Sequence, residues 1–97
     1  MEKAQQYVKL AEEAGRDGSH VASIMNYRTA VELATSREEL KLILQAAVTY
    51  ANGRLKKPLD QYATYIWAQK EIVTKLEGDP LEKIVVTEIA KIMQSSE

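Results

Sequence analysis

Several residue types are scarce or missing in this chain of 97 residues: it has no cysteine, no phenylalanine, one histidine, two prolines and four glycines. Without cysteine, neither a disulfide framework nor a thiolate-bound metal centre can form. The 13 basic and 14 acidic residues leave a formal net charge of -1. This balance argues against the strong electrostatic footprint of a nucleic-acid-binding protein, so we expect no nucleic-acid partner.

Long apolar runs are missing as well. No stretch approaches the roughly 20 residues that a membrane-spanning helix needs, so we expect no membrane span. The N-terminal residues Met1-Glu2-Lys3 do not resemble a secretory signal peptide, and we therefore expect a cytoplasmic protein. Hydrophobic residues still make up 45% of the chain, which favours a folded domain over a disordered segment.

The apolar residues recur at steps of three and four, which is typical of helices that bury one face. Five segments show this period, at about residues 4–14, 21–34, 38–57, 59–76 and 81–92. The pattern predicts an all-α fold, an antiparallel bundle of four to five helices that forms a single helical domain over residues 1–97. In the fourth segment the predicted inward face comprises Leu59, Tyr62, Ala63, Ile66, Val73 and Leu76.

Glycines mark the expected ends of the helices. Gly15 and Gly18 bracket the first gap. Gly53 either ends the third helix or lies inside a helix that continues to Lys57, the residue before a proline. Gly78 suits the left-handed stop of the fourth helix.

Two junctions also carry start signals. Ser36 and Glu39 have the spacing of a capping box, in which each side chain satisfies a free backbone N–H of the other residue. Asp79 can accept an early helical N–H, and Pro80 suits the first helical position. These signals predict the starts of the third and fifth helices.

Side chains that could carry catalysis are few. His20 is the only imidazole, and a zinc site usually needs three or four ligands, so we expect no bound metal and no cofactor. The adjacent carboxylates of Glu12-Glu13 and of Glu38-Glu39 point in different directions around a helix and are expected to face solvent. We therefore expect no catalytic residues, which means that the protein is not an enzyme.

Two surface features leave alternatives open. The basic cluster Arg54, Lys56 and Lys57 could contact phosphate, but no aromatic residues interleave with it, and a surface turn is the preferred interpretation.

Trp67 lies about 100° around the helix from Ile66. An exposed Trp67 would indicate binding to a partner or self-association, whereas a fourth helix covered on two sides would bury it.

The first two segments share a more specific pattern. It reads A-x3-V-x2-A-x-E, then a short gap with glycine, then I-x2-Y-x2-A-V-E. The residues are Ala4, Val8, Ala11, Glu13, Gly18, Ile24, Tyr27, Ala30, Val31 and Glu32. Small residues permit a close crossing of two helices while Tyr fills the wider gap, so the pattern predicts an antiparallel helical hairpin.

This hairpin resembles the first two helices of MIT (microtubule interacting and transport) domains and also a single tetratricopeptide repeat. Such repeats recur about every 34 residues, but that shift places Gln61 on Tyr27 and Thr64 on Ala30, which disfavours a repeat array. With Tyr50 near the end of a third helix, the resemblance to an MIT-like three-helix module covers residues 1–57. Residues 58–97 form an additional helical region outside it.

The resemblance implies a non-enzymatic adaptor that binds a helical or extended peptide motif. MIT domains bind short C-terminal motifs of ESCRT-III-type filament proteins, often in the groove between the second and third helices. On this chain the implied groove is lined by Met25, Arg28, Glu32, Leu44, Val48, Ala51 and Leu55. Two alternatives stay open: the last helices could cover this groove, or the chain could be a self-contained structural bundle or homodimer without a peptide groove.

Overall fold

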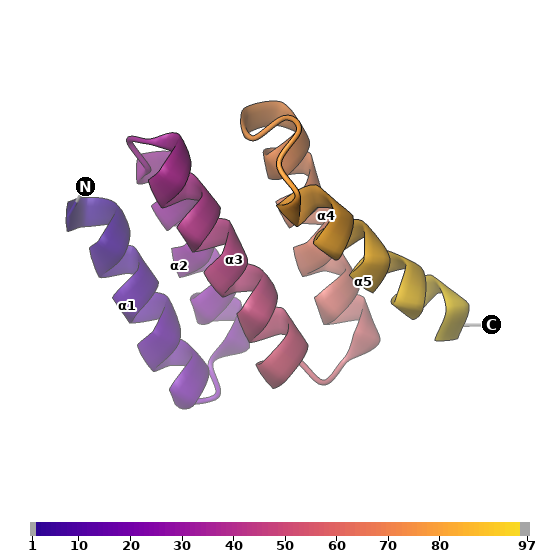
Figure 1. The fold of residues 1–97 in the computed structure, drawn as a ribbon. Coiled ribbons are helices and arrows are strands. Elements are labelled where there is room, and N and C mark those ends of the chain that lie inside the picture. The colour runs from indigo at the N-terminus through magenta and orange to yellow at the C-terminus, as the bar shows by residue number, and fades with distance from the viewer. Residues whose placement is uncertain (1, 96–97) are drawn as a thin grey trace. The chain divides into compact units, whose positions relative to one another are not determined.

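A computed structural model describes residues 2–95 of the chain, and its regular secondary structure is helical (Figure 1). Five helices follow one another: α1 Glu2–Arg16, α2 His20–Leu33, α3 Arg37–Arg54, α4 Pro58–Lys75 and α5 Leu81–Ser95. Within residues 2–95 there is no strand, which confirms the predicted all-α class and the five predicted helices.

The chain divides into two compact units, Met1–Ala47 and Val48–Glu97. The boundary falls inside α3, whose first half belongs to one unit and whose last turns belong to the other. The limit of the MIT-like resemblance, residue 57, lies beyond this boundary. Each unit is described below by itself.

Two of the glycines end helices because they adopt backbone angles that other residues rarely adopt. Gly18, after α1, has a φ of 82°, and Gly78, after α4, has a φ of 83°. The left-handed stop predicted at Gly78 is therefore confirmed. Gly15 and Gly53 instead lie inside α1 and α3, so Gly53 does not end the third helix, which continues to Arg54.

The start of α3 uses a variant of the predicted capping box. The Glu39 backbone N–H donates to Ser36 Oγ at 3.1 Å, as predicted. The Glu39 side chain, however, reaches one residue further back, and its Oε1 accepts from the backbone N–H of Thr35 at 2.9 Å and from Thr35 Oγ1 at 3.3 Å. At the start of α5, the Leu81 N–H donates to Asp79 Oδ1 at 2.9 Å, which confirms the predicted cap.

In Met1–Ala47, α1 and α2 run in opposite directions (Figure 1), and they pack against each other through small residues. Ala4, Ala11 and Ala30 are 0% exposed, and Tyr27 is buried as well. The buried Ser23 Oγ donates to the Ala11 backbone carbonyl at 2.8 Å, so a side chain of α2 reaches the backbone of α1 directly. This geometry confirms the predicted close-crossing hairpin.

In Val48–Glu97, α4 packs against α5 through larger side chains. The buried residues of this pair and its connecting loop are Thr64, Tyr65, Ala68, Ile72, Leu76, Leu81, Val85 and Ile89. Four residues of the predicted inward face of α4 lie in solvent: Leu59, Ala63, Ile66 and Val73. Tyr62, predicted in the core, is only half-buried.

The inward face of α4 was predicted wrongly for a physical reason. Both sides of α4 carry apolar residues at helical spacing, and the buried side includes Thr64 and Tyr65, which the predicted inward face did not include. Thr64 Oγ1 donates to the Asp60 carbonyl at 3.0 Å, and the Tyr65 hydroxyl donates to Asn52 Oδ1. Polar groups that are satisfied in this way can be buried at little cost.

Candidate functional site

A groove lies between α1 and the first half of α3 in Met1–Ala47, and we call it the α1–α3 groove. It has a volume of about 280 Å³ and is lined by Gln5, Val8, Lys9, Glu12, Glu39, Leu42 and Ile43. Ile43 is buried and Val8 is half-buried, whereas Leu42 is 66% exposed. The groove thus presents apolar surface to water.

Glu39 belongs both to the cap of α3 and to the lining of this groove. Its Oε1 is held by Thr35, while its Oε2 is buried and accepts no hydrogen bond from any group of residues 2–95. Burying an acceptor without a donor costs about 1–3 kcal/mol, and more for a charged group. The positive end of the α3 dipole offsets part of this cost, because Glu39 lies in the first turn of the helix.

The placement of Glu39 corrects the prediction that both carboxylates of the Glu38-Glu39 pair face solvent. Glu38 is exposed, but Glu39 is half-buried. Glu12, from the other predicted solvent pair, is exposed and lines the same groove from α1. The groove therefore brings together two carboxylates that lie far apart in the sequence.

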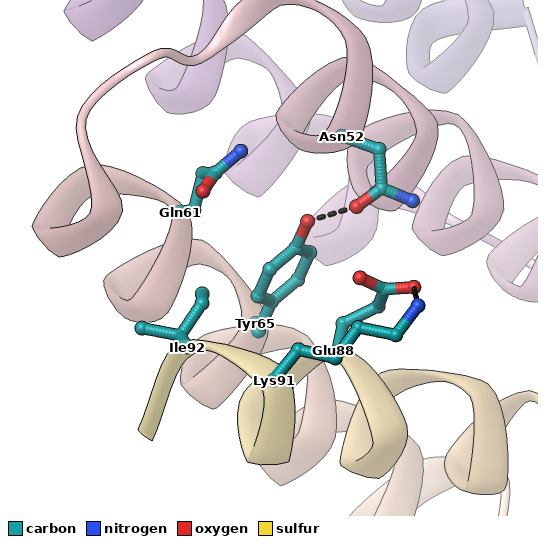
Figure 2. Close-up of a pocket in the computed structure, with 6 residues that line it drawn as sticks. All are labelled: Asn52, Gln61, Tyr65, Glu88, Lys91 and Ile92. Atoms are coloured by element: carbon teal, nitrogen blue, oxygen red, sulfur yellow. Dashed lines mark hydrogen bonds and ion pairs between the residues drawn. The ribbon is translucent and has the colours of Figure 1, made fainter. Parts of the chain in front are cut away.

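A second, polar hollow lies in Val48–Glu97, where the end of α3 meets α4 and α5. Figure 2 shows its lining residues, which enclose a volume of about 470 Å³: Asn52, Gln61, Tyr65, Glu88, Lys91 and Ile92. On α5, Lys91 Nζ lies 3.4 Å from Glu88 Oε1. The Tyr65 hydroxyl donates to Asn52 Oδ1 across the hollow, from α4 to α3.

The polar groups of this hollow attach α4 to the end of α3. Gln61 Nε2 donates to the backbone carbonyls of Ala51 at 3.2 Å and Leu55 at 2.9 Å. Carbonyls in the last turn of a helix lack partners within that helix, so Gln61 acts as a side-chain cap. Burial raises the pKa of the Tyr65 phenol, and the nearby Glu88 carboxylate raises it further, which keeps the hydroxyl a donor. We call these contacts of Gln61 and Tyr65 with the end of α3 the polar joint, and their role is structural.

Neither hollow holds a recognisable metal centre. Among residues 2–95, no group of three or more His, Cys, Asp or Glu side chains is placed to hold a metal ion. In the same part of the chain, no helix combines the length and the apolar character needed to cross a membrane.

The seven residues of the predicted groove fall in both units and differ in accessibility. The α2 residues are exposed: Met25, Arg28 and Glu32. The α3 residues are buried: Leu44, Val48, Ala51 and Leu55. The α2 part of the predicted groove is therefore open to solvent, whereas the side chains expected from α3 belong to the core.

Trp67, the residue considered for self-association, is half-buried on α4. It lies neither in the core nor fully in solvent. The basic cluster is exposed at all three positions, Arg54, Lys56 and Lys57, around the turn that follows α3.

The α1–α3 groove was not predicted from the sequence, although one residue of the sequence, Leu42, indicated it. Leu42 lies outside the inward face of α3 that the helical period defines, since Leu40, Ile43 and Leu44 are among the residues buried on that face. A large apolar residue beside such a face indicates a second apolar surface. The partner of that surface, α1, could not be identified from spacing within α3.

Comparison with known protein families, with curated proteins and with solved structures yields no match to this chain.

Proposed function

We propose that the chain is a non-enzymatic protein-interaction module, and that its unit Met1–Ala47 binds an apolar segment of a partner in the α1–α3 groove. One observation carries the proposal: Leu42 is 66% exposed beside a hollow lined by Val8 and the buried Ile43. A partner side chain in this hollow would remove apolar surface of both molecules from water.

The apolar part of the groove suits side chains of a peptide. The groove's volume of about 280 Å³ is close to the lower end of the roughly 300–1,000 Å³ of typical ligand pockets. A trough between two helices suits an amphipathic helix, whose apolar side chains at helical spacing fit along it.

The resemblance of residues 1–57 to MIT domains supports the same class of function. It also suggests a class of partner, the C-terminal motifs of ESCRT-III-type filament proteins. Because Leu44 is buried on the side of α3 where the resemblance implies the motif, we propose α1 and α3 as the helices that contact it.

The test is an NMR titration of the full chain with synthetic peptides of such C-terminal motifs. We expect the amide resonances of Val8, Leu42 and Ile43 to shift, and Leu42→Glu to abolish binding. Leu10→Glu is the matched control, because Leu10 is 46% exposed on α1 and does not line the groove. Binding that survives Leu42→Glu would overturn the groove assignment, and a panel without any binding would eliminate this class of partner.

A second candidate function, self-association of the chain, is favoured by the apolar residues that α4 leaves in solvent. Leu59, Tyr62, Ile66 and Val73 follow one another at steps of three, four and seven, which are the a and d positions of a heptad repeat. Leu59 is 82%, Ile66 39% and Val73 48% exposed. This period matches a second helix as the partner, and α4 of another copy supplies one.

Light scattering after size-exclusion chromatography tests this second candidate. A homodimer that Ile66→Glu dissociates would support it, with Val86→Glu as the control because Val86 is a comparably exposed apolar residue (43%) on α5. A blue shift of Trp67 fluorescence with rising protein concentration would accompany the dimer, since Trp67 is adjacent to Ile66. A chain that stays monomeric at every concentration would eliminate it.

A further inference from the structure

We infer that the α1–α3 groove selects a partner with a basic side chain, Lys or Arg, next to its apolar anchor, and that the Glu39 carboxylate binds this cation. The inference rests on the proposed function and specifies the chemistry of the partner. Its basis is an acceptor to which no group of residues 2–95 donates, on a residue that lines an apolar groove.

The two oxygens of Glu39 have different surroundings. Oε1 is fixed by the Thr35 N–H at 2.9 Å and by the Thr35 hydroxyl at 3.3 Å. Oε2 is buried, and no group of residues 2–95 donates to it. Glu39 lines the groove, and the terminal torsion of a glutamate is broad, so a donor that enters the groove can reorient this carboxylate. An incoming N–H donor would then satisfy Oε2.

The charges around the groove favour a cationic donor over a neutral one. Glu12 from α1 and Glu39 from α3 line the groove together with a single cation, Lys9, which leaves one negative charge in excess. An ammonium or guanidinium group makes charge-assisted hydrogen bonds with a carboxylate, which are stronger than bonds between neutral groups. An acidic side chain at the same position would be repelled by both glutamates.

The apolar lining accommodates the rest of such a side chain. Lys and Arg carry three or four methylene groups below the charge, and these groups can lie along apolar surface while the charged end reaches a polar partner. Val8 and Leu42 line the same groove as Glu39 and provide that surface. The groove thus fits an apolar anchor and a basic residue of one amphipathic helix.

The experiment selects peptides from a displayed library of randomised 14-residue amphipathic helices on the full chain. We expect enrichment of Lys or Arg beside apolar anchors. Affinities of the selected peptides are then measured for the wild type and three variants. Glu39→Gln keeps the carbonyl oxygen that caps Thr35 but replaces the unsatisfied oxygen by an NH2 donor. Glu38→Gln is the matched control, since Glu38 lies in the same helical turn and does not line the groove.

Glu39→Gln should weaken binding by about tenfold or more, the effect of losing one charge-assisted hydrogen bond. Glu12→Gln should have a smaller effect, and Glu38→Gln none. Replacing the enriched Lys or Arg of the peptide by Met should cost the wild type as much affinity, but should cost the Glu39→Gln variant little. This coupling between the two changes identifies the pair directly.

The outcomes separate this inference from the proposed function. Peptides that shift the resonances of Val8 and Leu42, but carry no enriched basic residue or bind Glu39→Gln equally well, would overturn the inference and leave the groove in place. A selection that yields no peptide, or only peptides that bind elsewhere, would overturn both. Thermal unfolding of Glu39→Gln establishes that the variant is folded before its affinity is interpreted.

Discussion

The two units of the chain pack their helices in different ways. In Met1–Ala47, α1 and α2 meet through alanines without exposed surface, and the Ser23 hydroxyl of α2 bonds to the α1 backbone. In Val48–Glu97, α4 and α5 pack through larger side chains, of which Ile72 and Val85 are 0% exposed. Helices in close contact have no room for added volume, whereas a wider interface depends on the volume it contains. The units should therefore be sensitive to opposite kinds of substitution.

The largest effect is expected from removing volume in Val48–Glu97. Ile72→Ala leaves a cavity in the α4 packing surface and should lower the free energy of unfolding by about 2–5 kcal/mol. Val73→Ala is the matched control on the next residue, which is 48% exposed, and should cost far less. Urea unfolding followed by Trp67 fluorescence measures this unit, because Trp67 is the only tryptophan of the chain. Equal costs for the two variants would contradict the buried face assigned to α4.

Adding volume should be the damaging change in Met1–Ala47. Ala30→Leu places an isobutyl group at a position that is 0% exposed, and overpacking of this kind costs about 1–3 kcal/mol. Ala22→Leu is the control on the exposed side of the same helix, where leucine is tolerated. Urea unfolding monitored by far-ultraviolet circular dichroism gives the two values. If Ala30→Leu is as stable as the control, α1 and α2 are less closely packed than the structure indicates.

These contrasts also explain which parts of the fold were predictable from sequence. Close crossings need small residues at fixed steps on both helices, and Ala4, Ala11 and Ala30 with Tyr27 form such a pattern within about 30 residues. Helix ends are likewise local, because a glycine such as Gly78 adopts the positive φ by itself and Asp79 caps α5 with its own side chain. The close crossing, the stop at Gly78 and the cap at Asp79 were therefore predicted correctly, whereas Gly15 lies inside α1.

The buried face of α4 was not predictable in the same way. Leu59, Ile66 and Val73 form a regular apolar face, but burial is decided by where α5 packs and by whether Tyr65 finds a hydrogen-bond partner on α3. The position of Glu39 likewise depends on contacts with residues that are far away in the sequence. Its spacing from Ser36 predicts a cap, whereas its position beside Val8 follows from how α1 packs on α3.

The hydrogen bond between the two closely packed helices should contribute less than their packing. Ser23→Ala removes the donor to the Ala11 carbonyl and should lower the free energy of unfolding by about 1 kcal/mol, since that carbonyl lies in a helix and retains its backbone partner. Thr29→Ala on the same helix is the control, because its hydroxyl bonds back to the Met25 carbonyl one turn earlier. A Ser23→Ala cost no greater than that of the control would indicate that small size alone holds this crossing together.

The smallest effect is expected at the polar joint of Val48–Glu97, and it depends on pH. Tyr65→Phe loses the bond to Asn52 Oδ1, but Asn52 is exposed and regains water, so the cost at neutral pH is near the lower limit of about 0.5 kcal/mol.

Burial, with a further contribution from Glu88, raises the pKa of Tyr65 in the folded chain above its ordinary value of about 10. The unfolded chain therefore loses this proton first as the pH rises. The stability that the protonated phenol provides is complete below the unfolded pKa and is lost as the pH rises through the folded one. In this alkaline range, the free energy of unfolding of the wild type, measured in urea, should fall more steeply with rising pH than that of Tyr65→Phe. Glu88→Gln should lie in between, because this substitution removes the second cause of the raised pKa. Equal slopes for the wild type and Tyr65→Phe would contradict this prediction, because they would show that folding does not raise the pKa of Tyr65.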